Sequence, residues 1–116
     1  MFEIIFYERK NGECPVEEFL LSLDVKMRAK MVGLLEILQD RGNELREPYS
    51  KFIGNGIFEL RCNSGNNISR IMYFFHLGHK IILTNGFIKK TQKTPLKEIE
   101  IAKSRKNEYL ERMINQ

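Results

Sequence analysis

The chain begins with an alternating pattern of apolar and polar residues and then changes to a helical one. Residues 2–8 alternate, which predicts a β-strand with one strongly apolar face. Pro15 is placed to open a helix that runs to about Leu21, after an Asn-Gly turn. A second helix is predicted from an N-cap at Asp24 to about Arg41. Its apolar stripe, which we expect to face the core, consists of Met27, Met31, Leu34, Leu35 and Leu38.

The second half of the chain has the pattern of β-strands joined by tight turns. Residues 57–62 and 68–76 are predicted to be the two arms of a hairpin around residues 63–67, and a last strand covers residues 80–89. Residues 51–53 are a candidate for one further short strand before them. The strands of the hairpin are antiparallel, because a connection of a few residues cannot join parallel neighbours.

A closing helix is predicted from Pro95 to about Met113, with Thr94 as its N-cap. Its inward face consists of Ile99, Ala102, Tyr109 and Met113. The side chains expected to point to solvent or to a ligand are Lys103, Arg105 and Lys106. The predicted order, β-α-α-β-β-β-α, defines an α+β fold in which a small antiparallel sheet has helices packed on one face. Residues 1–116 suffice for one such domain, and we expect the other face of the sheet to be open.

Composition narrows the class of protein. An apolar share of 42% argues against disorder, and no apolar run approaches the roughly 20 residues that span a bilayer. The first residues lack a basic segment and a cleavage site, so we expect no signal peptide and a cytoplasmic protein. Cys14 and Cys62 belong to no C-x-x-C pair, so we expect two free thiols, no metal site and no cofactor.

Charge is distributed unevenly, although the net charge is only +4. Residues 1–60 hold eight Lys/Arg and eleven Asp/Glu, which gives −3, whereas residues 61–116 hold eleven and four, which gives +7. A basic half in so small a domain is the electrostatic footprint of a polyanionic partner, most often a nucleic acid.

Three lysines, Lys89, Lys90 and Lys93, stand between the last strand and the last helix. Regular structure fixes both ends of this segment, so the repulsion between the ammonium groups favours a nearby anion. The alternative is a basic loop that is merely solvated. His76 and His79 flank a turn. Histidine is the natural general base near neutral pH, although a histidine in an exposed turn is usually only solvated.

Two arginines are candidates for the same ligand. If Gly65-Asn66 forms a two-residue turn, Arg61 falls directly opposite Arg70 on the hairpin. Like charges in this arrangement destabilise a sheet unless something compensates them. Ion pairs with Glu59 or a helix acid would do so, and so would a bound phosphate. Arg70 also interrupts an apolar strand, where a charge needs a partner or a ligand.

Several segments together resemble a known family. They are Phe58-Glu59-Leu60-Arg61, the aromatic strand that contains Arg70, and residues 86–95 with the helix that begins Lys97-Glu98-Ile99. Residues 2–8, residues 15–20 and Glu47-Pro48-Tyr49 extend the match to nearly the whole chain. The chain resembles the phage-derived Gp49-like branch of the RelE/HigB toxins, in the RelE/ParE superfamily. The string Phe-x-Lys-Lys-Thr-x-Lys-Thr-Pro is the most specific part of the match.

The resemblance implies the toxin of a type II toxin–antitoxin system. Such toxins enter the ribosomal A site and cut messenger RNA without a metal, as endoribonucleases that inhibit translation. The RNA's own 2′-hydroxyl attacks the adjacent phosphate, which leaves a cyclic phosphate and a free 5′-hydroxyl. By position, the resemblance assigns charge stabilisation to Arg61 and Arg70, and phosphate contact to Lys89 and Lys90, one of which is a candidate acid. The residues that we further expect to bind RNA are His79, Lys80 and Lys93.

The sequence departs from the family pattern where a general base is expected. Glu59 stands where many RelE proteins carry a second basic residue, and Asn85-Gly86 stand where some HigB relatives have a histidine. The late tyrosine of some members has no clear counterpart. The identity of the base is therefore open, and catalysis could be weaker than in relatives or rest on Lys89 and Lys90.

Two other functions share much of this pattern. ParE toxins have the same fold and act on DNA gyrase through protein contacts, and a plain nucleic-acid-binding module would bind with steep salt dependence and no cleavage. The four basic residues assigned to catalysis favour cleavage, because a gyrase binder needs no phosphate-binding cations there. The expected partners are the ribosome, messenger RNA and a cognate antitoxin with a DNA-binding domain, encoded adjacently. No membrane partner is expected.

Overall fold

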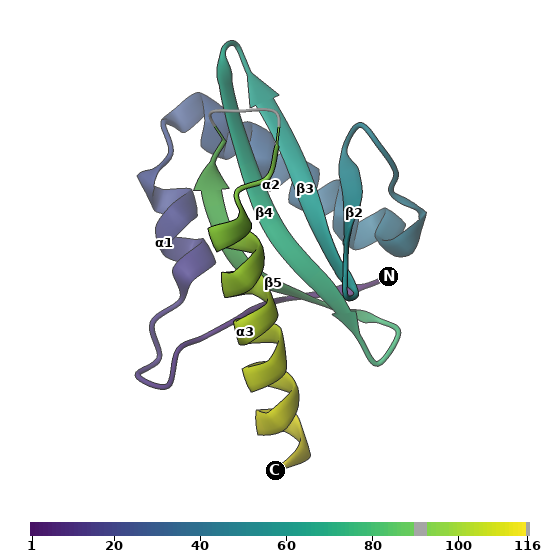
Figure 1. Ribbon diagram of the computed structural model, residues 1–116. Coiled ribbons are helices and arrows are strands. Elements are labelled where there is room, and N and C mark those ends of the chain that lie inside the picture. Colours follow the sequence, from purple (N-terminus) through teal and green to yellow (C-terminus); the bar gives the residue numbers. More distant parts are fainter. Residues whose placement is uncertain (90–92, 116) are drawn as a thin grey trace.

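The computed structural model describes residues 1–89 and 93–115. It has a central sheet with helices on both sides (Figure 1). Within these residues the sheet has five strands in the order β1-β5-β4-β3-β2. The strands are β1 (Glu3–Phe6), β2 (Ser50–Gly54), β3 (Ile57–Ser64), β4 (Asn67–His76) and β5 (Lys80–Ile88). The helices are α1 (Pro15–Ser22), α2 (Val25–Arg41) and α3 (Leu96–Ile114), with a 3₁₀ turn, η1 (Gly42–Glu44), after α2. The α+β class predicted from the sequence is confirmed.

The sheet is mixed rather than wholly antiparallel as predicted. The pairs β2–β3, β3–β4 and β4–β5 are antiparallel, but β1 pairs with β5 in parallel. After β1 the chain leaves the sheet through α1 and α2 and re-enters at the far edge with β2. Strands β2 to β5 then cross the sheet one after another until β5 lies beside β1. Each of these strands reverses the direction of the one before, and β5 runs parallel to β1. The predicted order is also one strand short, because the candidate strand at residues 51–53 is a full member, β2.

The start and the end of α2 follow from local sequence signals. The carboxylate of Asp24 accepts a hydrogen bond of 2.8 Å from the backbone N–H of Met27, which confirms the predicted N-cap. The apolar stripe predicted for this helix is buried. Gly42 ends the helix with φ = +54°, and a Cβ atom there would lie 2.0 Å from the ring of Phe2.

Both faces of the sheet are covered by helices, so the prediction that helices pack on one face only is wrong. In β4, Ile71 and Tyr73 pack in a core cluster with residues of α1 and α2. The alternate residues Met72 and Phe74 pack against α3, beside Ala102 and Tyr109 respectively. Figure 1 shows α3 in front of the sheet and α2 behind it. The uninterrupted apolar run of β4 is the pattern of a strand that is buried on both faces.

The beginning of α3 differs from the prediction in a way that concerns function. The N-cap position is Pro95, and the helix starts at Leu96. Thr94 does not cap the helix, since its hydroxyl donates a hydrogen bond to a carboxylate of β3.

Arg105 does not point away from the sheet, because its guanidinium donates to the backbone oxygen of Thr84 at 2.8 Å. None of the helices in the described part of the chain is long and apolar enough to cross a membrane.

Candidate functional site

The β3–β4 hairpin places two arginines directly opposite each other. Ser64 pairs with Asn67, so Gly65 and Asn66 form a two-residue turn, with Gly65 at φ = +62°. The resulting register pairs Arg61 with Arg70, as predicted for this turn. Since opposed like charges destabilise a sheet, the hairpin requires a compensating charge at this point.

Glu59 supplies that charge. Its side chain is fully buried, and its Oε1 atom lies 3.1 Å from Nε of Arg61, 3.6 Å from Nε of Arg70 and 3.7 Å from Nζ of Lys89. Its other oxygen accepts a hydrogen bond of 2.6 Å from the hydroxyl of Thr94. We call Glu59, Arg61, Arg70, Lys89 and Thr94 the Glu59 cluster. Of the alternatives that the sequence left open, the ion pair with Glu59 is confirmed.

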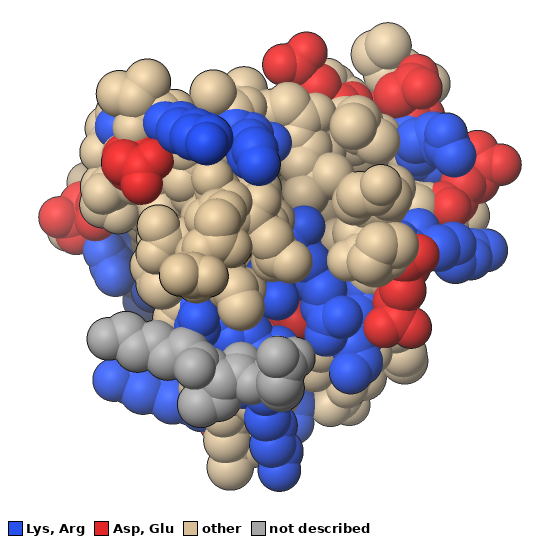
Figure 2. Space-filling view, turned by 90° about the horizontal axis from the view of Figure 1, so that it is seen from above, with Lys and Arg blue, Asp and Glu red and all other residues tan. Residues whose placement is uncertain are grey.

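One carboxylate does not balance three cations, so the Glu59 cluster has a formal charge of +2. A further carboxylate, Glu47, lies 3.7 Å from Nη1 of Arg61, but its side chain is 66% exposed and the pair is weak. Figure 2 looks at the molecule from above and shows blue Lys and Arg side chains gathered around a small red area near the middle of the view. The excess positive charge suits an anionic ligand.

Arg70 is only partly compensated within the cluster. Its Nη1 atom donates to the backbone oxygen of Ser69 at 2.9 Å and to the side-chain oxygen of Asn63 at 3.3 Å. Among the described residues, its buried Nε atom has no hydrogen-bond partner. Burial lowers the pKa of this guanidinium, and the carboxylate of Glu59 offsets only part of the effect. A desolvated cation in this state gains more from a bound anion than a solvated one does.

Lys89 is held in a similar way. Its backbone N–H donates to Ile68 at 2.7 Å, which extends the β4–β5 pairing by one residue and fixes the side chain near Glu59. The side chain is only 2% exposed. Burial lowers its pKa, and the charges of Arg70 and Arg61 lower it further, against the opposing effect of Glu59. An ammonium with a lowered pKa is better suited to proton transfer than an ordinary lysine.

The other predicted site residues fall into two groups. Lys93 is exposed and directly precedes Thr94, whereas Lys90 lies outside the described residues. His79 and Lys80 lie at the opposite end of the sheet, because Lys80 pairs with His76 where β5 begins and Phe87 pairs with Arg70 near its end. The structure therefore does not bring His79 or Lys80 to the Glu59 cluster.

His76 and His79 are also remote from the cluster. The ring of His76 packs edge-on against Tyr109 at 5.5 Å, and that of His79 bonds to the backbone oxygen of Leu77 at 3.0 Å. Neither is positioned as a base beside the arginines. In the described part of the chain, no group of three or more His, Cys, Asp or Glu side chains is placed to hold a metal ion.

Sequence reasoning missed two residues beside the site. Lys51 pairs with Glu59 across β2 and β3, so both side chains share one face of the sheet, and its charge acts on Lys89. Thr94 contacts Glu59 although its local sequence favours a helix cap. The sequence around Lys51 does not by itself place this residue beside Glu59. That placement also requires the register of β2 against β3.

The fold and the cluster define a class of small α+β proteins with a buried, excess-positive site at one end of the sheet. The model of the family described as phage-derived protein Gp49-like matches residues 18–107, which include the whole Glu59 cluster. The chain belongs to this family, which is among the toxin families of toxin–antitoxin systems. No curated protein matches the chain significantly.

Proposed function

We propose that this protein is a toxin of the RelE/HigB type that cleaves messenger RNA on the ribosome and is held inactive by a cognate antitoxin. The observation that supports this best is the Glu59 cluster, in which three cations converge on one buried carboxylate. A toxin acting on a protein target has no need for excess charge that is partly desolvated and held in place. A phosphodiester in its transition state does need it.

The proposed reaction uses the substrate's own nucleophile. The 2′-oxygen of one nucleotide loses its proton to solvent water and attacks the adjacent phosphorus, and the bond from phosphorus to the 5′-oxygen breaks. The leaving oxygen takes up a proton, so the products are a 2′,3′-cyclic phosphate and a 5′-hydroxyl. In this proposal Arg61 and Arg70 stabilise the charge on the phosphorane oxygens, and Lys89 is the proton donor. Glu59 is fully buried and acts as a positioning residue for these cations.

Mapping RNA 5′ ends after brief induction of the protein tests this function. The expected result is new 5′-hydroxyl ends inside translated codons, which disappear when an antibiotic clears ribosomes from the message before induction. Growth arrest without such ends would overturn the proposal and indicate a protein target such as DNA gyrase. Ends that persist on untranslated RNA would indicate a ribonuclease that works without the ribosome.

Cleavage should also depend on pH through Lys89. Because the pKa of this ammonium lies below its usual range, cleavage by the native chain is expected to fall as the pH rises through that lowered value. Arginine keeps its charge at these pH values, so Lys89→Arg should flatten the alkaline fall in cleavage rate, at the cost of a lower maximum rate. The measurement is single-turnover cleavage on programmed ribosomes across a pH series.

The matched control is Lys97→Arg, at an exposed position of α3, which should leave the profile unchanged. Unfolding does not explain the expected loss. A lysine with a lowered pKa in the folded state binds fewer protons folded than unfolded, so its contribution to stability rises with pH in this window. An identical alkaline fall for the native chain and Lys89→Arg would contradict a role for Lys89 as the acid.

A further inference from the structure

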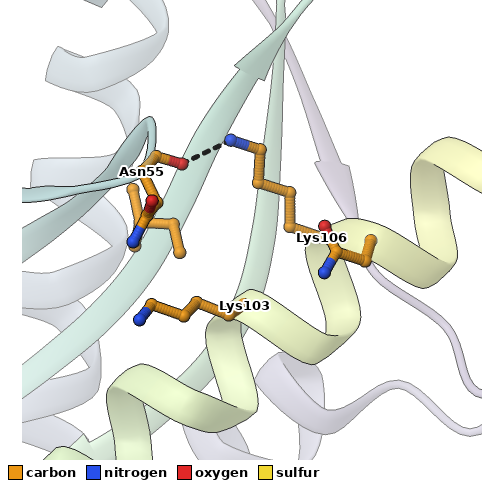
Figure 3. Close-up of a pocket in the computed structure, with 5 residues that line it drawn as sticks. Asn55, Lys103 and Lys106 are labelled. Atoms are coloured by element: carbon orange, nitrogen blue, oxygen red, sulfur yellow. Dashed lines mark hydrogen bonds between the residues drawn. The ribbon is translucent and has the colours of Figure 1, made fainter.

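A second basic site lies where α3 passes the turn between β2 and β3. It is a pocket of about 320 Å³ lined by Asn55, Ile57, Lys103, Lys106 and Asn107. Figure 3 shows Lys103 and Lys106 extending from α3 toward the turn that carries Asn55. Ile57 is 1% exposed and belongs to the core beneath, so a buried apolar residue lies under polar side chains. We call this the Lys106 pocket.

The turn between β2 and β3 holds the ammonium of Lys106 in place. Its Nζ donates a short hydrogen bond to the backbone oxygen of Asn55. Gly56 has φ = +75°, and a Cβ atom there would lie 2.6 Å from that Nζ, so the absence of a side chain leaves room for the ammonium. An ammonium has three N–H donors, of which this bond uses one. The ammonium also lies 5.7 Å from the centre of the Phe74 ring, and no further hydrogen bond engages it within the described residues, so two donors remain for a ligand beside that ring.

Charge in the Lys106 pocket is poorly compensated. Within the described residues, no carboxylate forms an ion pair with Lys106. Lys103 has one weak partner, Glu100, at 3.7 Å, and 62% of that side chain is exposed. The remaining polar groups are the amides of Asn55 and Asn107, which can donate hydrogen bonds without adding negative charge. Two ammonium groups and two amides match the oxygens of a phosphate.

The Lys106 pocket lies on the same face of the sheet as the Glu59 cluster. Ile57, Glu59 and Arg61 alternate along β3, so their side chains share one face, and Ile57 is about 13 Å from Arg61 at the rise of an extended strand. Lys51, directly across from Glu59, adds a cation on that face. Basic side chains therefore continue from the cluster to the pocket over a distance that a few nucleotides of RNA can span.

We infer that the Lys106 pocket binds a backbone phosphate of the RNA strand whose cleaved phosphate lies at the Glu59 cluster. This inference rests on the proposed function and assigns a second contact with the same substrate. A phosphate here would fix the strand's direction across the sheet and leave its bases free.

Binding of a cleavage-resistant RNA tests the inference without relying on catalysis. The probe is a short fluorescent 2′-O-methyl RNA, titrated with the protein over a series of salt concentrations. Replacing both lysines, Lys103→Gln with Lys106→Gln, should reduce the slope of log Kd against log salt by about 0.7, since the pocket binds one phosphate and each phosphate neutralised on a single strand contributes about 0.7. The variant Lys103→Arg with Lys106→Arg, which keeps both charges, should retain most of the slope.

The control removes two charges elsewhere, through Lys10→Gln with Lys26→Gln at exposed positions, and should change the slope much less. An equal loss in both Gln variants would overturn the inference, because net charge alone would then explain binding. Competition by polyglutamate as effective as that by unlabelled RNA would also overturn it, in favour of an acidic protein ligand. If messenger RNA is cleaved at codons but the two Gln substitutions leave the salt slope unchanged, only the phosphate contact at the Lys106 pocket is refuted. If the substitutions reduce the slope but no cleavage occurs, only the proposed nuclease activity is refuted.

Discussion

Arg70→Met is expected to abolish growth arrest and to reduce RNA cleavage by about 10²–10³-fold while the protein stays folded. Arg70 shares the single carboxylate of Glu59 with two other cations, and its buried Nε has no hydrogen-bond partner among the described residues, so its charge is only partly neutralised before a phosphorane forms. Loss of one preorganised donor to a developing oxyanion typically costs this much in rate. Methionine fills a similar length, and Glu59 keeps Arg61, Lys89 and Thr94 as partners. Removing one desolvated cation from an excess therefore costs little stability.

The measurement combines 5′-end mapping with thermal unfolding of the purified variant. Arg41→Met removes an exposed arginine at the end of α2 and serves as the matched control, with arrest and cleavage unchanged. A variant that unfolds at Arg70 would show that this side chain is needed chiefly for the structure. Full cleavage by folded Arg70→Met would remove the central residue from the proposed mechanism.

The sequence predicted the register of the hairpin for one of its possible turns, because turn chemistry is local. If Gly65-Asn66 forms a two-residue turn, that turn fixes the pairing of every residue along both arms, and the structure shows this case with Arg61 opposite Arg70. The charge rule for opposed residues then indicated Glu59 as one possible compensator. The class of fold came from the same local signals, namely the periodicity of the helices and the spacing of the strands.

The missed features depend on contacts between distant segments. Thr94 has the local sequence of a helix cap. Its hydroxyl instead donates a hydrogen bond to the buried carboxylate of Glu59, 35 residues earlier in the chain. Lys51 became relevant only through the register of β2 against β3. His79 directly precedes the last strand and Lys80 begins it, so the length of β5 separates both from the cluster at its other end. Their position beside the last strand in the sequence was therefore a poor guide to their distance from the Glu59 cluster.

The second face of the sheet was assigned wrongly for a different reason. An unbroken apolar run from Ile71 to Phe75 favours burial on both faces, but size alone suggested that so small a domain covers only one. The inward face of α3 was predicted correctly, and Ala102 and Tyr109 are buried. Helix α3 therefore had a predicted apolar stripe, and β4 had apolar residues on both faces. Combining these two predictions would have placed α3 on the second face of the sheet.

Glu59→Gln is expected to destabilise the protein strongly, because it removes the one buried carboxylate on which three cations converge. Breaking a buried charge pair by neutralising one partner typically costs about 3–5 kcal/mol, and for a chain of this size we expect a fall in Tm of roughly 10–20 °C. The control is Glu47→Gln. Its carboxylate also contacts Arg61 but is mostly exposed, so the change should cost under about 0.5 kcal/mol.

Sulfate separates the two roles that the Glu59 cluster combines. If the excess charge is an anion site, sulfate should raise the Tm of Glu59→Gln more than that of the native chain, because a ligand that binds only the folded state stabilises it by an amount that grows with the logarithm of its concentration over Kd. Arg70→Met added to Glu59→Gln should recover part of the lost Tm and weaken the response to sulfate. Equal shifts with sulfate in all three proteins would mean that the salt acts on the whole surface. The Glu59 cluster would then be a structural ion-pair network, and the case for phosphate chemistry at this end of the sheet would fail even if the protein proved toxic.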